Sequence, residues 1–301
     1  MPISLTQNVL GSKQKKTIFI LVFLIAFLNS FFVTAQSYSK LVDTKIGSEG
    51  SGLGCGFNFV GAAYPFGMIQ FTPSFFSPQK GFVVNQLSGA GCPHMGNFPV
   101  LPISGVLQDS PNNMENFDKY TSIIESHAGF VSLEMSDKTK AKLTANKRAG
   151  IANFVFDKSK AEGTIIIGSG VSSTNITNSM VQITSDKTCE GFAEGGDFCG
   201  SETNYRIYFV AEFDRSSIDK GTWIKDKILK NSDQAFGVNS GAYFTFNSDK
   251  EVNYRIAISY VSVENAKENL KLSSLVGGFS TYKVNAEKAW DKSLSKISIK
   301  T

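Results

Sequence analysis

Histidine, tryptophan and cysteine are scarce in this 301-residue sequence, and their scarcity limits the kinds of site it can hold. The two histidines are His94 and His127, and there is no GxSxG motif, so a Ser/His/Asp hydrolase site is not indicated. The four cysteines include no CxxC pair and have no histidine cluster beside them, which argues against a zinc site. Internal repeats are also missing, which argues against a repeat-built structural protein.

The first 35 residues have the layout of a secretory signal peptide. Residues 1–16 contain three lysines and no acidic residue, and an apolar run over residues 17–33 ends at Val33-Thr34-Ala35. We expect cleavage after Ala35, and an exported protein that is periplasmic, on the cell surface or secreted. The run is also close to the length of a membrane span, so an uncleaved anchor is the alternative.

Without this segment the chain has almost no net charge. Removing three of the 30 basic residues leaves 27 against 26 acidic ones. A nucleic-acid-binding protein needs a clustered basic face, and the sequence shows none. Neither nucleic acid nor, after cleavage, a membrane is an expected partner.

Glycine and proline are concentrated in residues 47–105, which hold 12 of the 27 glycines and six of the eight prolines. The same stretch contains one carboxylate, Glu49, and one basic residue, Lys80. Glycine permits left-handed backbone and proline fixes φ, so this density predicts loops held in set conformations. The interleaved Phe, Tyr, Met and Val are unlike a flexible linker. We interpret the stretch as a structured surface that faces a site.

Two blocks in this stretch resemble the N-terminal domain of glycoside hydrolase family 92, the calcium-dependent exo-acting α-mannosidases. Residues 65–73 read PFGMIQFTP and follow Ile46-Gly47-Ser48 and Val60-Gly61-Ala62. Residues 87–102 read LSGAGCPHMGNFPVLP. The resemblance continues in further segments as far as Trp290, so it covers nearly the whole mature chain.

The sequence departs from the family pattern at three places. Val60 stands where proline is usual, Asn85-Gln86 where a Ser-His-Thr-His run is common, and Asn97 where aspartate is common. These changes bear on substrate preference more than on membership.

The part of the sequence between residues 120 and 261 predicts an antiparallel β-sandwich, similar to the galactose-mutarotase-like superfamily. Alternating β-branched and aromatic residues recur between short turn signals, and no helical pattern intervenes. The expected strands cover residues 120–125, 130–135, 141–147, 151–156, 164–167, 180–184, 206–213, 222–228, 242–246 and 254–261.

Helical periodicity appears only late in the chain. Ser262 is the expected cap of a helix over residues 263–270, and a second helix over about 280–295 has Tyr282, Ala286 and Trp290 on one stripe. The second pattern runs to Thr301 without a cap or a glycine. We divide the chain into a signal peptide (1–35), a β-sandwich (36–275) and a helical linker (276–301). In the family, such a linker leads into a larger (α/α)₆ barrel, which is missing here.

The resemblance implies that the catalytic acid and base, and most groups around the calcium, lie on that barrel. Inverting glycoside hydrolysis needs two carboxylates about 6.5–9.5 Å apart, whereas the glycine-rich stretch supplies only Glu49. We expect a non-catalytic half of an exo-α-mannosidase that hydrolyses α-mannosides of mannans or N-glycans with inversion. It would be inactive alone, and either a gene fragment or one half of a split enzyme.

By the same resemblance, the glycine-rich stretch forms one wall of the sugar site. Backbone donors around Ser88 and neighbouring polar side chains are the expected contacts to terminal mannose. His94 is the preferred histidine, although a histidine satisfied by a nearby carbonyl is an equal alternative. No catalytic or metal-binding residue is assigned to this chain. The expected sugar-binding residues are Asn58, Asn85, Gln86, Ser88, Gly89, Gly91, His94 and Asn97.

Other acidic residues are less convincing as site residues. Glu125 beside His127 falls at a predicted strand end, where cross-strand or turn pairing is the better interpretation. A second acidic group lacks the residue order of an EF-hand and is interpreted as a solvated turn. That group consists of Glu190, Glu194, Asp197 and Glu202.

The cysteines permit two disulfides in an exported protein. Cys189–Cys199 would close a short loop, and Cys55–Cys92 would join the two family-like blocks. Buried free thiols are an equal alternative.

Two other classes of function stay open. One is a stand-alone carbohydrate-binding module. The scarcity of tryptophan argues against it, because the sequence has only Trp223 and Trp290, and Trp290 falls on the linker helix. The other is a structural or adhesion domain without sugar specificity.

Overall fold

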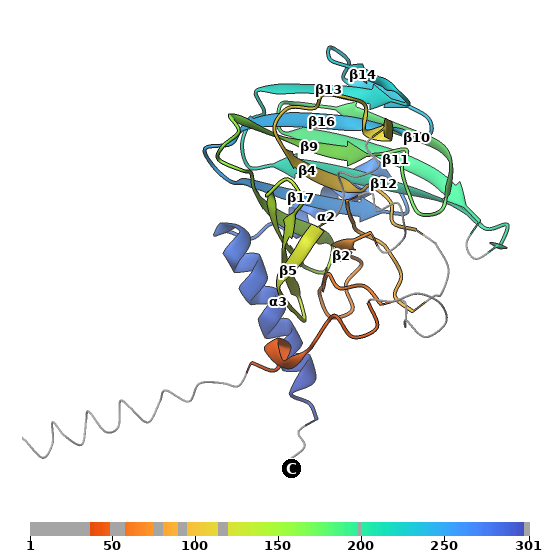
Figure 1. Ribbon diagram of the computed structural model, residues 1–301. Coiled ribbons are helices and arrows are strands. Elements are labelled where there is room, and N and C mark those ends of the chain that lie inside the picture. The colour runs from red at the N-terminus through yellow and green to blue at the C-terminus, as the bar shows by residue number, and fades with distance from the viewer. Residues whose placement is uncertain are drawn as a thin grey trace, which may run out of the picture. The chain divides into compact units, whose positions relative to one another are not determined.

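A computed structural model describes residues 37–48, 58–74, 81–89, 95–113, 120–197 and 200–297 (Figure 1). Their strands form two sheets in which every neighbouring pair is antiparallel. The eight-stranded sheet has the order β1 (Ala62–Ala63), β2 (Gln70–Pro73), β3 (Phe82–Val83), β4 (Val100–Ser104), β9 (Glu162–Gly168), β16 (Ser240–Asn247), β13 (Asp219–Ile224) and β14 (Lys227–Leu229). The nine-stranded sheet has the order β15 (Gln234–Phe236), β10 (Asn175–Ile183), β11 (Thr188–Gly196), β12 (Asn204–Phe213), β17 (Val252–Ser259), β8 (Ala149–Val155), β7 (Lys140–Ala145), β6 (Phe130–Met135) and β5 (Tyr120–His127).

The core lies between the two sheets. Alternate side chains of a strand face the same side, so Phe209 and Phe213 of β12 both point inward and are buried. Ring contacts then join the sheets: Phe213 lies 4.9 Å from Phe244 of β16, and Phe209 lies 4.3 Å from Phe98, measured between ring centroids. The predicted mainly β, antiparallel sandwich is confirmed.

The strand prediction was wrong at two places. Of the acidic residues interpreted as a solvated turn, Glu190 and Glu194 are in fact on strand β11, where they face outward while Cys189 and Ala193 face the core. Asp197 and Glu202 are exposed and lie outside the strands. Because Gly191 and Gly195 occupy inward positions, the sequence lacks the apolar–polar alternation expected of a strand. The single strand predicted over residues 222–228 is the hairpin of β13 and β14, which turns at Lys225 in the left-handed region (φ 48°).

The glycine-rich stretch is less loop-like than its composition predicts. Besides the short strands β1 to β3 it supplies β4, which pairs with β9 within the eight-stranded sheet. Two glycines are required by close contact between strands. A Cβ at Gly61 would lie 2.2 Å from the Phe71 carbonyl oxygen, and one at Gly81 would lie 2.5 Å from the Val100 oxygen.

Two α-helices follow β17. Helix α2 (Val263–Leu272) begins as predicted at Ser262, whose side chain accepts a hydrogen bond from the Asn265 amide at 3.1 Å. Helix α3 (Gly278–Leu294) ends at Ser295, earlier than its sequence pattern suggests. Short 3₁₀ turns, η1 (Tyr38–Leu41) and η2 (Pro111–Asn113), complete the described helices. None of these helices has the length and apolar character needed to cross a membrane.

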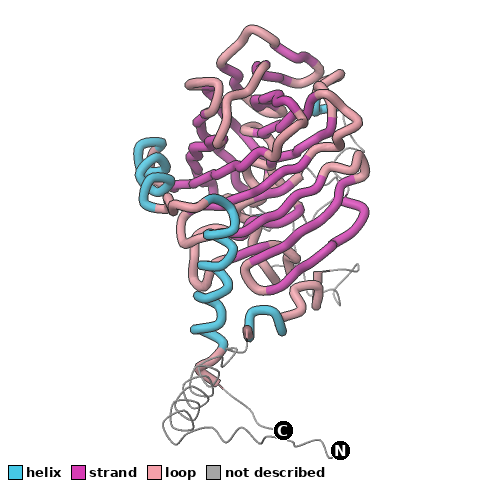
Figure 2. Tube along the Cα trace, turned by 90° about the vertical axis from the view of Figure 1, so that its left-hand side faces the viewer, coloured by secondary structure: helices cyan, strands magenta, loops and turns pink. Residues whose placement is uncertain are grey.

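Helix α3 runs beside the strands of the sandwich (Figure 2), and directional contacts fix it there. The Trp290 indole donates to the Ala63 carbonyl at 2.6 Å, and Asp291 accepts from the Ser39 amide at 2.7 Å. Tyr282 is buried against the nine-stranded sheet. The described residues from Tyr38 onward therefore form one compact unit that includes the helix.

The Glu125–His127 pair also belongs to this contact. Nε2 of the buried His127 lies 3.3 Å from carboxylate oxygens of both Glu125 and Glu287, the latter on α3. Lys283 of α3 lies 3.5 Å from Glu125 and 3.6 Å above the Phe130 ring. The pair therefore holds the helix, which the sequence interpretation as turn or cross-strand pairing missed.

Cys189 is a free thiol, buried in the core. The disulfide proposed between Cys189 and Cys199 is therefore wrong. Burial raises the pKa of the Cys189 thiol far above its ordinary value. The other three cysteines lie outside the described residues.

Candidate functional site

Two of the expected sugar-binding residues, Asn85 and Asn97, form a buried pair. The Asn85 side-chain amide donates to Asn97 Oδ1 at 2.9 Å, and the Asn97 backbone amide donates to Asn85 Oδ1 at 2.7 Å. Their exposed fractions are 2% and 0%. These two hydrogen bonds tie the loop after β3 to the loop before β4.

A chain of hydroxyl groups extends this pair toward the nine-stranded sheet. The Tyr205 hydroxyl donates to Asn97 Oδ1 at 2.8 Å and lies 2.9 Å from Thr174 Oγ1. Ser172 lies 3.1 Å from Thr174 and donates to the Met95 carbonyl at 2.7 Å. The two sheets and both loops are thus joined by one polar network, in which Asn97 Nδ2 has no partner among the described residues.

Among the described residues of the expected site, Asn58, Ser88 and Gly89 are accessible. Ser88 Oγ donates to Asn58 Oδ1 at 2.8 Å, and Ser88 and Gly89 are exposed. The Asn58 backbone amide is held by the Gly47 carbonyl at 2.9 Å. A hydroxyl, a side-chain amide and a glycine backbone therefore share one accessible edge.

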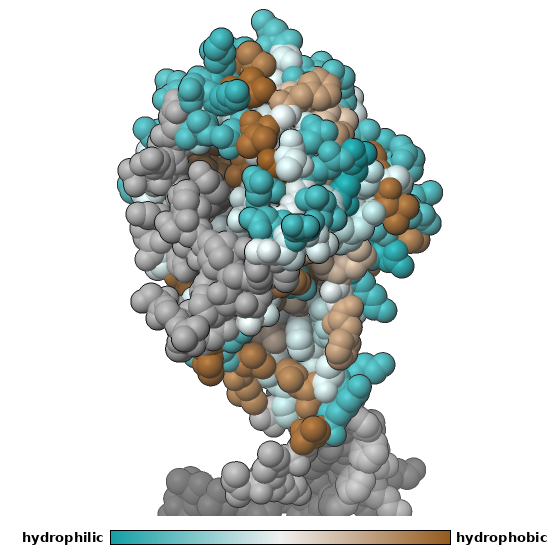
Figure 3. Space-filling model, turned by 90° about the vertical axis from the view of Figure 1, so that its right-hand side faces the viewer, coloured by the Kyte–Doolittle hydropathy of each residue, from teal (hydrophilic) through white to brown (hydrophobic). Residues whose placement is uncertain are grey.

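The glycine-rich stretch also has exposed apolar side chains, one of them next to Ser88. Phe66, between β1 and β2, is fully exposed, and Met68 and Leu87 are each 39% exposed. The β1–β2 loop lies beside the Asn85 loop because the Gln70 amide donates to the Val84 carbonyl. In Figure 3 hydrophobic residues are visible at the lower end of the molecule, where η1 and the last turns of α3 lie in Figure 1, and also near its upper end.

Backbone strain is concentrated in the same region. Phe66, Met95 and Phe98 have φ between 54° and 56°, the left-handed region that non-glycine residues rarely adopt. The other four such residues in the described chain occupy turns or loops next to strands. Strained non-glycine residues persist where the surrounding structure fixes them, often at functional sites. The loops thus have the set conformations that their composition predicts.

Sequence reasoning missed two tyrosines of this region. Tyr205 connects to Asn97, and Tyr260, after β17, approaches Met95 with its hydroxyl 4.0 Å from the sulfur. Their rings are 6.5 Å apart, and burial raises the pKa of the Tyr260 phenol. Both come from distant strand ends, so only the sheet topology brings them to the loops.

The remaining expected residues divide between the core and the undescribed segments. Gln86 is buried at 2% exposure, next to Asn85. Gly91 and His94 lie outside the described residues, so the choice between a sugar contact and a satisfied histidine stays a prediction.

Carboxylates are missing from the described part of the glycine-rich stretch. Residues 58–74, 81–89 and 95–105 contain no aspartate or glutamate. Among all described residues, no three His, Cys, Asp or Glu side chains lie close enough together to hold a metal ion. The described surface therefore offers polar and apolar contacts but neither a carboxylate pair nor a carboxylate cluster of the kind that holds calcium.

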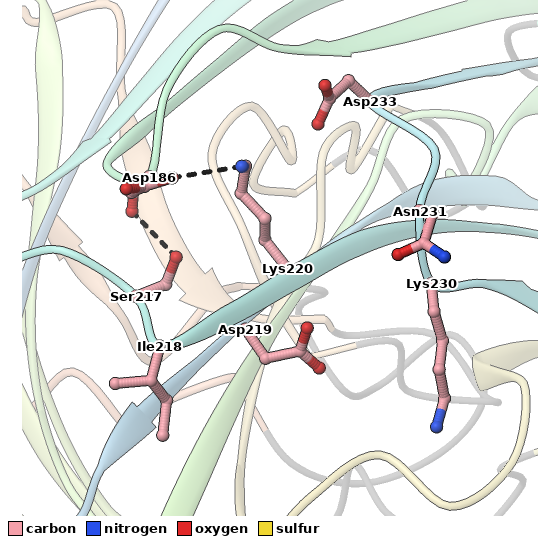
Figure 4. Close-up of a pocket in the computed structure, with 8 residues that line it drawn as sticks. All are labelled: Asp186, Ser217, Ile218, Asp219, Lys220, Lys230, Asn231 and Asp233. Carbon is pink, nitrogen blue, oxygen red and sulfur yellow. Dashed lines mark hydrogen bonds and ion pairs between the residues drawn. The ribbon is translucent and has the colours of Figure 1, made fainter.

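A separate polar pocket of about 400 Å³ lies at the other end of the same strands (Figure 4). Lys220 points at Asp186, with its Nζ 3.1 Å from Oδ1, and Asp233 and Lys230 line the opposite side. The loop network meets the first residues of β12 and the pocket lies beyond its last, so about 30 Å separates them for a ten-residue strand. The pocket is no part of the site described above.

Comparison with known proteins gives the same family as the sequence blocks. The profile described as the glycosyl hydrolase family 92 N-terminal domain matches residues 41–259. A search of curated proteins found no match to the chain.

Solved structures of α-mannosidases have the same fold. A family GH92 α-mannosidase of Bacteroides thetaiotaomicron is 24% identical with a TM-score of 0.77, over 88% of this chain and 39% of that one. Its complex with mannoimidazole matches with a TM-score of 0.76 at 23% identity, covering 88% and 38% of the two chains. A GH92 inverting mannosidase of the same organism has a TM-score of 0.71 at 17% identity, covering 89% and 37%. This chain thus spans about two-fifths of the length of the structures it matches.

Proposed function

Because the chain belongs to glycosyl hydrolase family 92, we propose that it is the N-terminal half of an exo-α-mannosidase and forms one wall of the sugar site. The observation that carries this proposal is the accessible edge of Asn58, Ser88 and Gly89, with the exposed Leu87 next to Ser88 and the exposed Phe66 elsewhere in the same stretch. Hydroxyl and amide groups suit the hydroxyls of a terminal mannoside, and the apolar side chains suit a second protein surface.

The chemistry belongs to another domain. Inversion needs an acid and a base carboxylate flanking the bond, about 6.5–9.5 Å apart, and the described loops carry none. A family 92 barrel domain supplies both carboxylates and most of the calcium ligands. The chain itself orients the sugar, and orientation contributes substantially to rate when both walls are present.

The fixed attachment of α3 supports this division of labour. Trp290 and Asp291 fix the helix beside the glycine-rich loops, so a domain that packs against its end would meet those loops in a set orientation. The predicted signal peptide places the assembled enzyme outside the cytoplasm, where mannans and N-glycans occur.

The proposal is tested by mannose release from α-linked mannobioses in the presence of calcium. We expect none from the chain alone and measurable release after mixing with a family 92 barrel domain. Asn58→Ala and Ser88→Ala should raise KM in the mixture, whereas Ile218→Ser, at the opposite strand ends, should not. Mannose release by the chain alone would show that its own carboxylates suffice, and would overturn the proposal.

A further inference from the structure

The outer face of the nine-stranded sheet carries a row of apolar side chains across four strands. The strand registers place Phe236 of β15 opposite Met180 of β10, Met180 opposite Phe192 of β11, and Phe192 opposite Tyr208 of β12. Directly paired residues share a face, and neighbouring residues such as Val181 are buried inward, so all four side chains face outward. Phe236 is 57% exposed and the other three are partly exposed.

Rows of hydrogen-bonding side chains flank this apolar row on both sides. On one side Asn178 donates to Glu194 at 3.1 Å, and Glu194 pairs with Arg206. On the other side Gln234 donates to Gln182, which is the cross-strand neighbour of Glu190. The face is therefore apolar along its middle and rich in amides and carboxylates along both edges.

The charges on this face cancel locally. Arg206 neutralises Glu194, and Lys267 of α2 lies 2.9 Å from Glu190. The Arg206 guanidinium also lies 4.8 Å from the Phe192 ring centroid, which holds it flat against the sheet. A surface without net charge does not select an acidic or basic partner, so its ligand is expected to be uncharged.

The dimensions of the row favour a thin, extended ligand. Strands about 4.8 Å apart give the four residues a length of roughly 14 Å, and the flanking rows lie about 7 Å away along the strands. A stable protein interface needs about 800 Å² on each partner, far more than one row of four side chains provides. Beyond Tyr208 the face is closed by α2, which packs on Val210.

We propose that this row binds a linear, uncharged polysaccharide. Pyranose rings have C–H faces that stack on aromatic and thioether side chains, while their hydroxyls lie at the rim within reach of the flanking amides and carboxylates. The surface would hold polymer on the outside of the sandwich, separate from the terminal sugar at the loops. The choice of an α-mannan as the first probe rests on the proposed function. The inference that the row binds a polysaccharide does not depend on that function.

The test is affinity electrophoresis of the protein in gels containing α-mannan, a β-glucan or, as a charged control, a polyuronate. We expect α-mannan to retard the protein, and the double variant Met180→Ser, Phe236→Ser to weaken the apparent association roughly fivefold or more. Ile218→Ser is the matched control, because Ile218 is 51% exposed but lies outside the row. Circular dichroism checks that each variant is folded.

The other outcomes are equally decisive. Retardation by β-glucan but not α-mannan would support the surface while counting against the proposed mannoside function. Retardation lost in Asn58→Ala and Ser88→Ala but kept in the double variant would assign the polymer to the loops and overturn this inference. No retardation in either uncharged polymer would overturn it too, as would self-association in sedimentation that Phe236→Ser abolishes, which would make the ligand a second copy of the chain.

Discussion

Two polar pairs of the loop region use similar residues in opposite ways. Asn85 and Asn97 are buried and bonded to each other twice, whereas Asn58 and Ser88 are bonded once at the surface. In the first pair desolvation makes every missing hydrogen bond costly, so the pair holds the loops together. In the second, water can replace the bond, so the Ser88 hydroxyl and Asn58 Oδ1 can meet a ligand while the Asn58 side-chain amide is held by the Ile46 carbonyl at 3.3 Å.

A third case separates burial from pairing. Tyr254 is fully buried between the sheets, yet its hydroxyl has no hydrogen-bond partner among the described residues. Its ring packs against Phe213 at 5.3 Å, so its stabilising contribution is apolar. Burial with pairing, burial without it and pairing at the surface should therefore respond differently to substitution.

The largest effect is expected for Asn97→Ala. The change removes the acceptor shared by Asn85 and Tyr205. The buried Asn85 amide loses this bond while the Tyr205 hydroxyl keeps Thr174, so the free energy of unfolding should fall by about 2 kcal/mol. Urea unfolding followed by fluorescence measures it, with Asn58→Ala as the exposed control. A loss no greater than that of the control would mean that the buried pair does not hold the loops.

A smaller loss is expected for Tyr205→Phe. Only the hydroxyl that bonds Asn97 and Thr174 is removed, while the ring remains, so about 1 kcal/mol should be lost. Tyr208→Phe, on the outer face of the same strand, is the matched control in the same unfolding experiment. Equal effects of the two variants would show that the network adds nothing beyond ring packing.

Tyr254→Phe should be neutral or stabilising by up to about 1 kcal/mol, because it removes an unpaired buried hydroxyl and keeps the ring. Burial also raises the pKa of Tyr254 well above its usual 10. A raised pKa in the folded state means stability that is complete below pH 10 and lost as the pH rises above it. Unfolding measured from pH 9 to 11.5 should therefore show a shallower decline in the variant; an unchanged decline would contradict this account.

The smallest effect on stability is expected for Ser88→Ala. Its hydroxyl is exposed and bonds Asn58 among the described residues, so the free energy of unfolding should change by less than about 0.5 kcal/mol. A loss above 1 kcal/mol in the urea experiment would place Ser88 with the structural residues rather than at a ligand-facing edge.

Most of the fold could be predicted from the sequence because the periodicity of strands and helices is a local pattern. Alternation predicted β6 at its observed bounds, Phe130–Met135, and the cap at Ser262 located the start of α2. It failed at β11, where Gly191 and Gly195 occupy inward positions and two of the outward residues, Glu190 and Glu194, are acidic. There the strand is stabilised by neighbours on both sides, β10 and β12, which a local pattern does not contain.

The candidate site was only partly readable for the same reason. Composition predicted loops with set conformations, and their polar residues were expected to contact sugar, whereas Asn85, Gln86 and Asn97 are buried. Burial of Asn85 and Asn97 depends on Tyr205, 108 positions from Asn97 along the chain, and no spacing rule connects them. Whether a polar residue supports a site or faces its ligand is decided by such distant partners.

The contact between Ser39 and Asp291 joins residues 252 positions apart. Ser39 belongs to η1, and its carbonyl accepts a hydrogen bond from the Ala128 amide. The turn η1 therefore lies between the β5–β6 hairpin and α3. During synthesis that binding place is incomplete until α3 has left the ribosome, because half of it is the helix. We therefore expect η1 to dock late in folding, after the rest of the domain has been synthesised.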